Sequence, residues 1–328
     1  MTTYLIVAAV ATSMWLGMAE LYLRVAYSEG LSFSSHGGPL VARFERDFQF
    51  NDYDGPSRGP EVSGPKREGA IRILIEGDSI TWGQGVKPES SLYTSLLRDR
   101  LRAINPGVEV ATLAYPGREI DAHLAQLGKW GEEIAPDAIV YQWFLNDLEI
   151  DKSQRPGRDR RWRKILFPDF LRARSYLWFL LDYRIGVWLN ADPYEDYMYA
   201  RYSRGTPDWR MFATVFHAWA DEAKRLTPHV LVVLYPYLEP SPTVPFREFD
   251  AWVRELCDEE GIAVLNLLEP LEVFRDDFTQ TFASPFDSHP NAAAHARIAE
   301  ALYHRILDLW PELFHPPLQT PEAQGRHV

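Results

Sequence analysis

The sequence predicts an α/β fold in which helices cover both faces of a parallel β-sheet. Five short apolar segments, rich in β-branched residues, recur along the chain, and segments with apolar residues at helical spacing separate them. Continuous apolar strands that alternate with helices are typical of a parallel sheet buried on both faces. The predicted strands are Ala70–Gly77, Val108–Gly117, Ala138–Asp147, His229–Leu238 and Ile262–Leu268.

The predicted helices each have one apolar face and end at residues that favour turns. The first, for example, is closed by Asn105-Pro106-Gly107, a combination that cannot continue a helix. The helices are expected at Ser90–Ile104, Glu119–Ile134, Asp208–Arg225, Phe246–Glu260 and Asn291–Trp310.

A long excursion, about residues 148–207, interrupts this alternation after the third strand. Loops of this length are rarely structureless inside a compact domain, so we expect a helical cap insertion over the carboxyl ends of the strands. It holds a basic cluster, Arg155–Lys164, that is typical of a solvated face. It also holds an aromatic stretch, Ser175–Leu189, that is typical of core packing, with contact to a membrane surface or an acyl chain as the alternative.

The N-terminal segment, residues 1–27, is predicted to be a membrane anchor. Tyr4–Met18 is apolar and uncharged, and it reaches the length of about 20 residues that a span needs only by including Glu20. A cleaved signal peptide is the alternative, but no basic residue precedes Tyr4 and bulky residues follow the run. Only Arg24 bears on orientation, and we expect the domain to lie outside the cytoplasm. A linker rich in Gly, Ser and Pro (28–69), a domain at 70–312 and a loose tail (313–328) follow.

Composition excludes several functional classes. A formal net charge of −12 and a pI of about 5.3 make nucleic acid an unfavourable partner. Cys257 is the single cysteine, so no internal disulfide forms, and neither a cysteine-rich metal spacing nor H-E-x-x-H occurs. Neither a Walker A sequence nor G-x-G-x-x-G follows the first strand. Nucleotide binding through either of these motifs is therefore disfavoured.

Chemically useful residues follow the predicted strands at the edge where parallel α/β sheets bind ligands. Ser79 follows the first strand, Gly117 the second and Asn146 ends the third, while Asp287 and His289 come after the fifth. A serine hydroxyl becomes a nucleophile when a base such as His289 removes its proton. In an extended segment residues i and i+2 share a side, so Asp287 can lie beside the His289 ring and orient it.

The same edge supplies donors for a negatively charged oxygen. Acyl transfer passes through a tetrahedral intermediate whose oxyanion needs preorganised hydrogen-bond donors. The backbone N–H groups of Ser79 and Gly117 and the side-chain amide of Asn146 are the candidates. By contrast, Asp78, Asp147 and His295 are interpreted as structural residues.

The motifs "GDSIT", "YPGRE", "FLND" and "DSHPNAAAH" together resemble the blocks of the SGNH hydrolases, the GDSL-type esterase/lipase superfamily. The resemblance runs from about Ile71 to Trp310 and leaves out the cap. It implies a flavodoxin-like three-layer α/β/α sandwich with five central parallel strands. It also implies hydrolysis of a small-molecule, lipid or glycan ester or thioester without metal or cofactor. In this resemblance Ser79 is the nucleophile, His289 the base, and Gly117 and Asn146 help to form the oxyanion hole.

Two positions depart from the family pattern. The third block usually reads G-x-N-D, and here Phe144 stands at the glycine position. The last block usually reads D-x-x-H, which places the acid at Phe286, whereas Asp287 lies one step closer to the histidine. A triad with Asp287 and a Ser79–His289 dyad therefore both remain open.

Three functions are compatible with this sequence. The first is a membrane-tethered serine esterase. The second is an O-acyltransferase or deacetylase that acts on envelope polysaccharide. The third is a non-catalytic binding protein on the same fold, since a fold alone does not fix a function.

Overall fold

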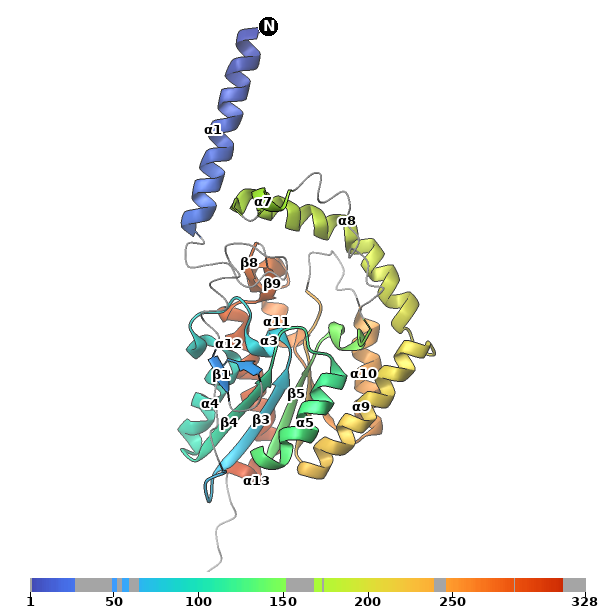
Figure 1. The fold of residues 1–328 in the computed structure, drawn as a ribbon. Helices are drawn as coiled ribbons and strands as arrows, with labels where there is room; N and C mark the ends of the chain where they lie inside the picture. Colours follow the sequence, from blue (N-terminus) through green and yellow to red (C-terminus); the bar gives the residue numbers. More distant parts are fainter. Residues whose placement is uncertain are drawn as a thin grey trace, which may run out of the picture.

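The computed structural model describes residues 2–26, 49–51, 55–58, 65–151, 168–172, 174–238, 246–285 and 287–314. Its centre is a parallel five-stranded sheet with the order β4-β3-β5-β6-β7, which confirms the predicted fold class (Figure 1). The strands are β3 (Ile71–Gly77), β4 (Val108–Ala114), β5 (Ala138–Trp143), β6 (Val230–Leu234) and β7 (Ala263–Asn266).

The strand order reverses beside β3, the first strand of this sheet along the chain. β4 pairs with one side of β3, from Ile71 opposite Val108, and β5 pairs with the other side, from Ile73 opposite Ala138. In open α/β sheets such a reversal opens a crevice at the carboxyl ends of the strands, where ligands bind. The residues that follow β3 and β5 therefore meet at this crevice.

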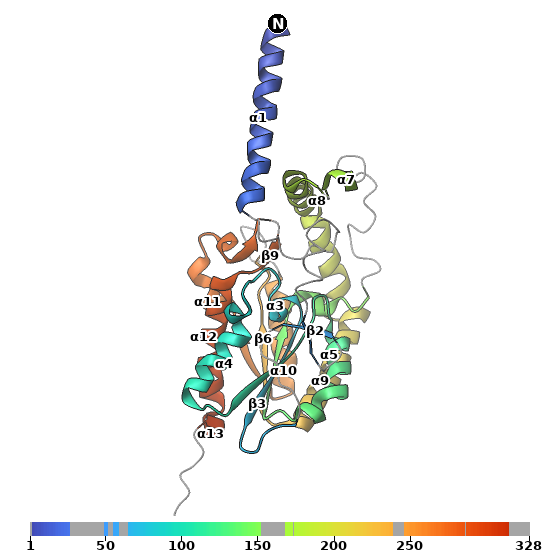
Figure 2. The ribbon, with the colours of Figure 1, turned by 60° about the vertical axis from the view of Figure 1, so that its left-hand side comes forward.

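Helices cover the two faces of the sheet, as the apolar strands require (Figure 2). Ile73 and Ile75 point into the core under α4 and α12, whereas Leu74 points into the core under α5, α9 and α10. This alternation follows from the period of two in a strand. The bounds are α4 (Tyr93–Ile104), α5 (Ile120–Ile134), α9 (Pro207–Leu226), α10 (Arg247–Glu259) and α12 (Ala292–Leu309).

Several short elements complete the described structure. The antiparallel hairpin β8–β9 was not predicted as a strand pair, and it carries Asp287 and His289. A second short antiparallel pair, β1–β2, lies within the predicted linker. The short elements are β1 (Gln49–Asn51), β2 (Gly55–Ser57), α3 (Ser79–Trp82), η1 (Glu89–Ser91), η2 (Leu145–Leu148), α11 (Leu268–Leu271), η4 (Glu272–Phe274), η5 (Phe278–Thr281), β8 (Phe282–Ser284), β9 (Asp287–Pro290) and α13 (Pro311–Phe314).

The described part of the excursion after β5 is helical and consists of α7 (Asp169–Arg172) and α8 (Tyr176–Tyr202). The C-terminal end of α8 packs into the core through Met198 and Tyr202. The interpretation of the aromatic stretch as core packing is wrong for Trp178 and Trp188, whose side chains are exposed. The basic cluster Arg155–Lys164 lies outside the described residues.

Helix α1 (Thr2–Ala26) is the apolar N-terminal segment. By length and composition it can cross a membrane, and a signal sequence meets the same criterion. Its apolar side chains are almost all exposed. Most of the predicted linker and all but the first two residues of the predicted tail lie outside the described residues.

Candidate active site

Ser79 lies at a sharp exit from β3, at the first position of α3. The Asp78 carboxylate caps this short helix by accepting a hydrogen bond from the Ile80 N–H at 2.9 Å, which confirms its structural role. Gly77 is required here, because an added Cβ would lie 2.0 Å from Thr81 Oγ1. The turn therefore fixes the serine, which is buried except for a small exposed fraction.

The structure brings Ser79, His289 and Asp287 into one row of contacts. Ser79 Oγ lies 2.7 Å from His289 Nε2, and His289 Nδ1 contacts Asp287 Oδ1. Ser79 and the His289–Asp287 pair, which lie more than 200 residues apart in the sequence, thus form a hydroxyl–imidazole–carboxylate series. In this series the carboxylate contacts one ring nitrogen, Nδ1, and the other, Nε2, faces the hydroxyl.

Asp287 is itself held in place. Its Oδ1 accepts the His289 backbone N–H at 3.0 Å, and its Oδ2 accepts from Gln84 Nε2 at 3.3 Å. The side chain is almost completely buried. The neighbouring Phe286, at the family's usual acid position, lies outside the described residues. These contacts favour a triad that includes Asp287 over a Ser79–His289 dyad.

The hairpin β8–β9 carries the row's imidazole and carboxylate. Ser284 pairs with Asp287 near the tip, and Phe282 pairs with Pro290 at the base. Asn291 closes the base, because its N–H donates to Thr281 O at 2.6 Å and its side chain caps α12 by accepting from the N–H groups of Ala293 and Ala294. His289 is therefore positioned from the start of a long helix.

Asn146 lies in η2, directly after β5. The Asp147 carboxylate accepts the Phe144 N–H at 2.9 Å and so shapes this turn, while Oδ1 of the Asn146 side chain is buried without a hydrogen-bond partner among the described residues. Phe144 has φ −140° and ψ 161°, an extended conformation that any residue adopts. The glycine of the family pattern is therefore not needed, and the Phe144 ring packs against Tyr237 instead.

Gly117 occupies a turn that touches the Ser79 loop. Its φ of +78° lies in the left-handed region that favours glycine, although open space surrounds the position of a Cβ. The Tyr115 N–H donates to Gly77 O at 3.3 Å and joins this loop to the end of β3. Gly117 and Ser79 thus follow neighbouring strand ends.

Buried polar residues lie beneath the site. Burial raises the pKa of Glu76 to about 8, although the Trp219 indole N–H, which donates to its carboxylate at 2.9 Å, and Arg118 both lower it. Burial, reinforced by Asp78, raises the pKa of Asp147 well above its usual value. Burial lowers the pKa of His123 to about 3. The His123 imidazole is therefore neutral near pH 7, so its 3.8 Å contact with Asp147 is not a salt bridge.

His295 does not take part in the row. It is fully buried, accepts the Tyr93 backbone N–H at 3.0 Å, and burial lowers its pKa to about 3. These contacts confirm its interpretation as a packing residue. Within the described ranges there is also no group of three or more His, Cys, Asp or Glu side chains that can hold a metal ion.

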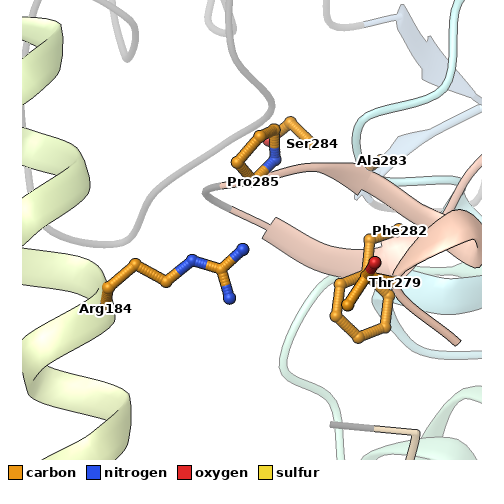
Figure 3. Close-up of a pocket in the computed structure, with 6 residues that line it drawn as sticks. All are labelled: Arg184, Thr279, Phe282, Ala283, Ser284 and Pro285. Carbon is orange, nitrogen blue, oxygen red and sulfur yellow. The ribbon is translucent and has the colours of Figure 1, made fainter. Parts of the chain in front are cut away.

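A cavity of about 240 Å³ lies between α8 and the β8 side of the hairpin. Figure 3 shows the Arg184 side chain reaching from α8 toward the hairpin tip, opposite Ser284 and Pro285. The lining residues are Arg184, Thr279, Phe282, Ala283, Ser284 and Pro285. Ser284 pairs with Asp287, so the cavity adjoins the contact row without including it.

Sequence reasoning missed two of these features. Gln84 belongs to the glycine-rich turn after Ser79, but nothing in its spacing indicates a partner 203 residues away. Arg184 lies in the aromatic stretch Ser175–Leu189. The sequence of this stretch does not indicate which side of the helix faces the hairpin, and only the packing of α8 shows that Arg184 is on that side. Both depend on tertiary contacts between distant segments.

A flavodoxin-like sheet with a Ser–His–Asp row at its carboxyl edge has the arrangement of a serine-type hydrolase. The family model of the GDSL-like Lipase/Acylhydrolase family matches residues 76–297, which is more than half of the chain. The chain therefore belongs to this family and is a GDSL-type esterase or acylhydrolase, a hydrolase that acts on ester bonds.

Several solved structures are similar to this chain. The crystal structure of TesA is 18% identical, with a TM-score of 0.47, and the alignment covers 73% of this chain and 99% of TesA. Axe2, an acetylxylan esterase from Geobacillus stearothermophilus, is 19% identical with a TM-score of 0.44 and coverage of 72% and 94%. The psychrotrophic esterase EstA from Pseudoalteromonas sp. is 15% identical with a TM-score of 0.43 and coverage of 72% and 97%. The comparison with curated proteins gave no match.

Proposed function

We propose that the protein is a membrane-tethered serine esterase that cleaves a carboxylic ester or thioester through a covalent acyl-enzyme. The observation that carries this proposal is the row from Ser79 Oγ to His289 Nε2, at 2.7 Å, and from His289 Nδ1 to Asp287. A serine within hydrogen-bond reach of an oriented imidazole is the arrangement that activates a hydroxyl nucleophile.

In the acylation step Ser79 Oγ attacks the ester carbonyl carbon, and its proton passes to His289 Nε2. The Asp287 carboxylate stabilises the resulting imidazolium and keeps Nε2 directed at the serine. When the carbonyl re-forms, the bond from the acyl carbon to the leaving group breaks, which is a C–O bond in an ester and a C–S bond in a thioester. His289 returns the proton to this oxygen or sulfur. The products of this half-reaction are the free alcohol or thiol and acylated Ser79.

The oxyanion of each tetrahedral intermediate needs donors already in place. The N–H of Ser79 is suited to this role, because the first N–H groups of a helix have no acceptor within it. The side-chain amide of Asn146, which follows β5, and the Gly117 N–H from the loop after β4 complete the proposed set.

Deacylation repeats the same chemistry with water. His289 removes a proton from a water molecule, the hydroxide attacks the acyl carbon, and the proton returns to Ser79 Oγ as the acid leaves. No metal or organic group enters any of these steps. The cavity that Arg184 lines supports binding of the non-reacting part of the ester beside the hairpin.

Covalent labelling tests the chemistry. A fluorophosphonate probe should label the parent protein and the exposed-serine control Ser90→Ala, while Ser79→Ala should not be labelled. Ser90 is exposed and lies in η1, three residues before α4 begins. Equal labelling of all three proteins, or of none, contradicts the proposal. Esters of rising acyl chain length, with acetylated glycans and a sugar acceptor alongside, then separate hydrolysis from acyl transfer.

For location, we infer that α1 remains attached and crosses the membrane once, with the esterase domain outside the cytoplasm. Its length and apolar composition support this inference. Protease added to intact cells should digest the domain, and extraction at high pH should leave the full-length chain in the membrane. Recovery of a soluble chain that begins after residue 26 contradicts the inference.

A further inference from the structure

The turn at residues 83–86, which follows α3, is bonded to two members of the contact row. The carbonyl oxygen of Ser79 accepts from the N–H groups of Gly83 and Gln84, both at 3.0 Å. The Gln84 side chain donates from Nε2 to Asp287 Oδ2 at 3.3 Å. This turn therefore supports the backbone of the nucleophile and the carboxylate at the far end of the row at the same time.

The turn has little to hold it in one conformation by itself. Gly83 and Gly85 have φ values of +76° and +83°, in the left-handed region, and glycine is the residue that loses most conformational freedom when it is fixed. Inside the turn, the Val86 N–H donates to Gly83 O at 3.1 Å. Contacts from outside the turn are therefore important for keeping Gln84 in place.

Arg58 makes such contacts from the segment that the sequence predicts to be a linker. Its Nη1 donates to Gly83 O at 2.8 Å, and its Nη2 donates to Val86 O at 2.7 Å. The guanidinium also lies 4.8 Å from the centre of the Trp82 ring. A planar guanidinium carries its donors in a fixed fork and stacks on aromatic rings, so this side chain suits both tasks. Arg58 thus joins the two ends of the turn.

The burial of Arg58 makes this fork a built contact. The side chain is only 10% exposed, and a charged group in such a place is costly unless it is bonded. Its contact with the Glu89 carboxylate is 3.9 Å long, which is weaker than either hydrogen bond to the turn. Hydrogen bonds from a charged donor are stronger than those between neutral groups. The geometry of the fork therefore matters more here than the ion pair.

We propose that Arg58 is a positioning residue for the hydrolysis. Through the turn and Gln84 it keeps the Asp287 carboxylate directed at His289, and through α3 it holds the nucleophile in place. This inference rests on the proposed function, since it assumes that the contact row cleaves the ester. The catalytic unit then begins at Arg58, before the matched residues 76–297 and inside the predicted linker.

Steady-state kinetics of the full-length protein with a soluble p-nitrophenyl ester tests this role. The variants are Arg58→Met, Gln84→Met and the double variant, in which methionine keeps an unbranched chain but has no donor. Arg58→Lys keeps the charge, but one ammonium group cannot reproduce the fork. The control is Arg67→Met, because Arg67 is exposed and bonded to Glu109 near the start of β4, at the opposite edge of the sheet. Urea unfolding shows which variants are folded under the assay conditions.

Arg58→Met and Gln84→Met should each lower kcat by about 10- to 100-fold, with KM changed less than twofold, because misplacement of the row affects the chemical step. Arg58→Lys should show a smaller loss in kcat, and Arg67→Met should keep the kcat of the parent. The double variant should lose no more than about threefold beyond the weaker single variant, because residues that act along one path are not additive.

The outcomes separate this inference from the proposed function. If the parent hydrolyses the ester while folded Arg58→Met retains its kcat, or changes only KM, Arg58 is not a positioning residue. Losses that multiply in the double variant show that Arg58 does not act through Gln84. If Arg58→Lys also fails to fold, Arg58 serves general stability and the inference is wrong. If the parent neither hydrolyses esters nor reacts with a fluorophosphonate, the proposed function is wrong and the inference fails with it.

Discussion

Two regions of this protein differ in how they use polar and apolar residues. At the carboxyl edge of the sheet, polar side chains are buried and bonded to one another, as in the contacts of His289 with Ser79 and Asp287. Along α1 and the first half of α8, large apolar side chains are exposed, and Trp188 exposes 78% of its surface. In the proposed function the first region cleaves the ester bond and α1 of the second anchors the protein. The two functions should therefore respond separately to mutation.

The largest effect is expected for the imidazole. His289→Ala should lower kcat/KM for a soluble ester by about 10⁴-fold or more, because Ser79 loses its base. Asp287→Asn should lower it by about 10³- to 10⁴-fold, since the ring then loses its orienting charge. Steady-state kinetics with a p-nitrophenyl ester measures both, with the exposed His304→Ala and Asp276→Asn as controls. A loss below tenfold for Asp287→Asn indicates a Ser79–His289 dyad.

The next effect concerns the oxyanion. Asn146→Ala should reduce kcat by about 10²- to 10³-fold with little change in KM, because the amide acts mainly on the developing negative charge. The fold should persist, since Oδ1 of the Asn146 side chain has no hydrogen-bond partner among the described residues. Circular dichroism and fluorophosphonate labelling check the fold and the serine. A rise in KM at unchanged kcat would instead assign Asn146 to substrate binding.

A third prediction tests the buried acid beneath the site. Because the folded-state pKa of Glu76 is raised to about 8 from 4.5, the folded protein holds a proton that the unfolded chain loses. Stability should therefore fall as the pH rises from about 4.5 to about 8, at roughly 1.4 kcal/mol per pH unit from this group alone. Glu76→Gln should remove this part of the slope.

Urea unfolding of the parent, Glu76→Gln and the exposed control Glu133→Gln at several pH values measures this effect. The Gln variant should gain stability relative to the parent as the pH rises, while the control should follow the parent. Parallel curves for all three proteins show that Glu76 is ionised in the folded state.

The smallest effect is expected at the junction of α1 with α8. Glu20 of α1 accepts hydrogen bonds from the Tyr176 and Leu177 N–H groups at the start of α8. Glu20→Gln weakens this helix cap and should cost about 1 kcal/mol locally. Hydrolysis of a soluble ester should change less than twofold, because the contact row lies in the other region. A short-chain ester in solution and a lipid ester in vesicles, assayed side by side, measure the separation. An equal loss on both substrates shows that the two regions are coupled.

The fold and the members of the site were largely predictable, because both follow from local patterns. Apolar strands and helical periodicity predicted the sheet, and the polar residues that follow the strands pointed to the sheet edge at which Ser79 lies against His289. The hairpin β8–β9 was not predictable in the same way, because its strands are short and its pairing is set by Asn291 and the start of α12. The exposure of Trp188 and the bonds of Glu20 depend on the packing of distant helices.

The hairpin has one fixed end and one variable end. Asn291 ties the base to α12, close to the imidazole of His289. The tip, with Ser284 and Pro285, borders the cavity that faces Arg184. In the proposed esterase, substitutions at Ser284 and Pro285 would reshape the cavity and so the preferred ester, while Ser79 and His289 themselves stay unchanged. The tip is thus the natural place to direct laboratory evolution toward new substrates.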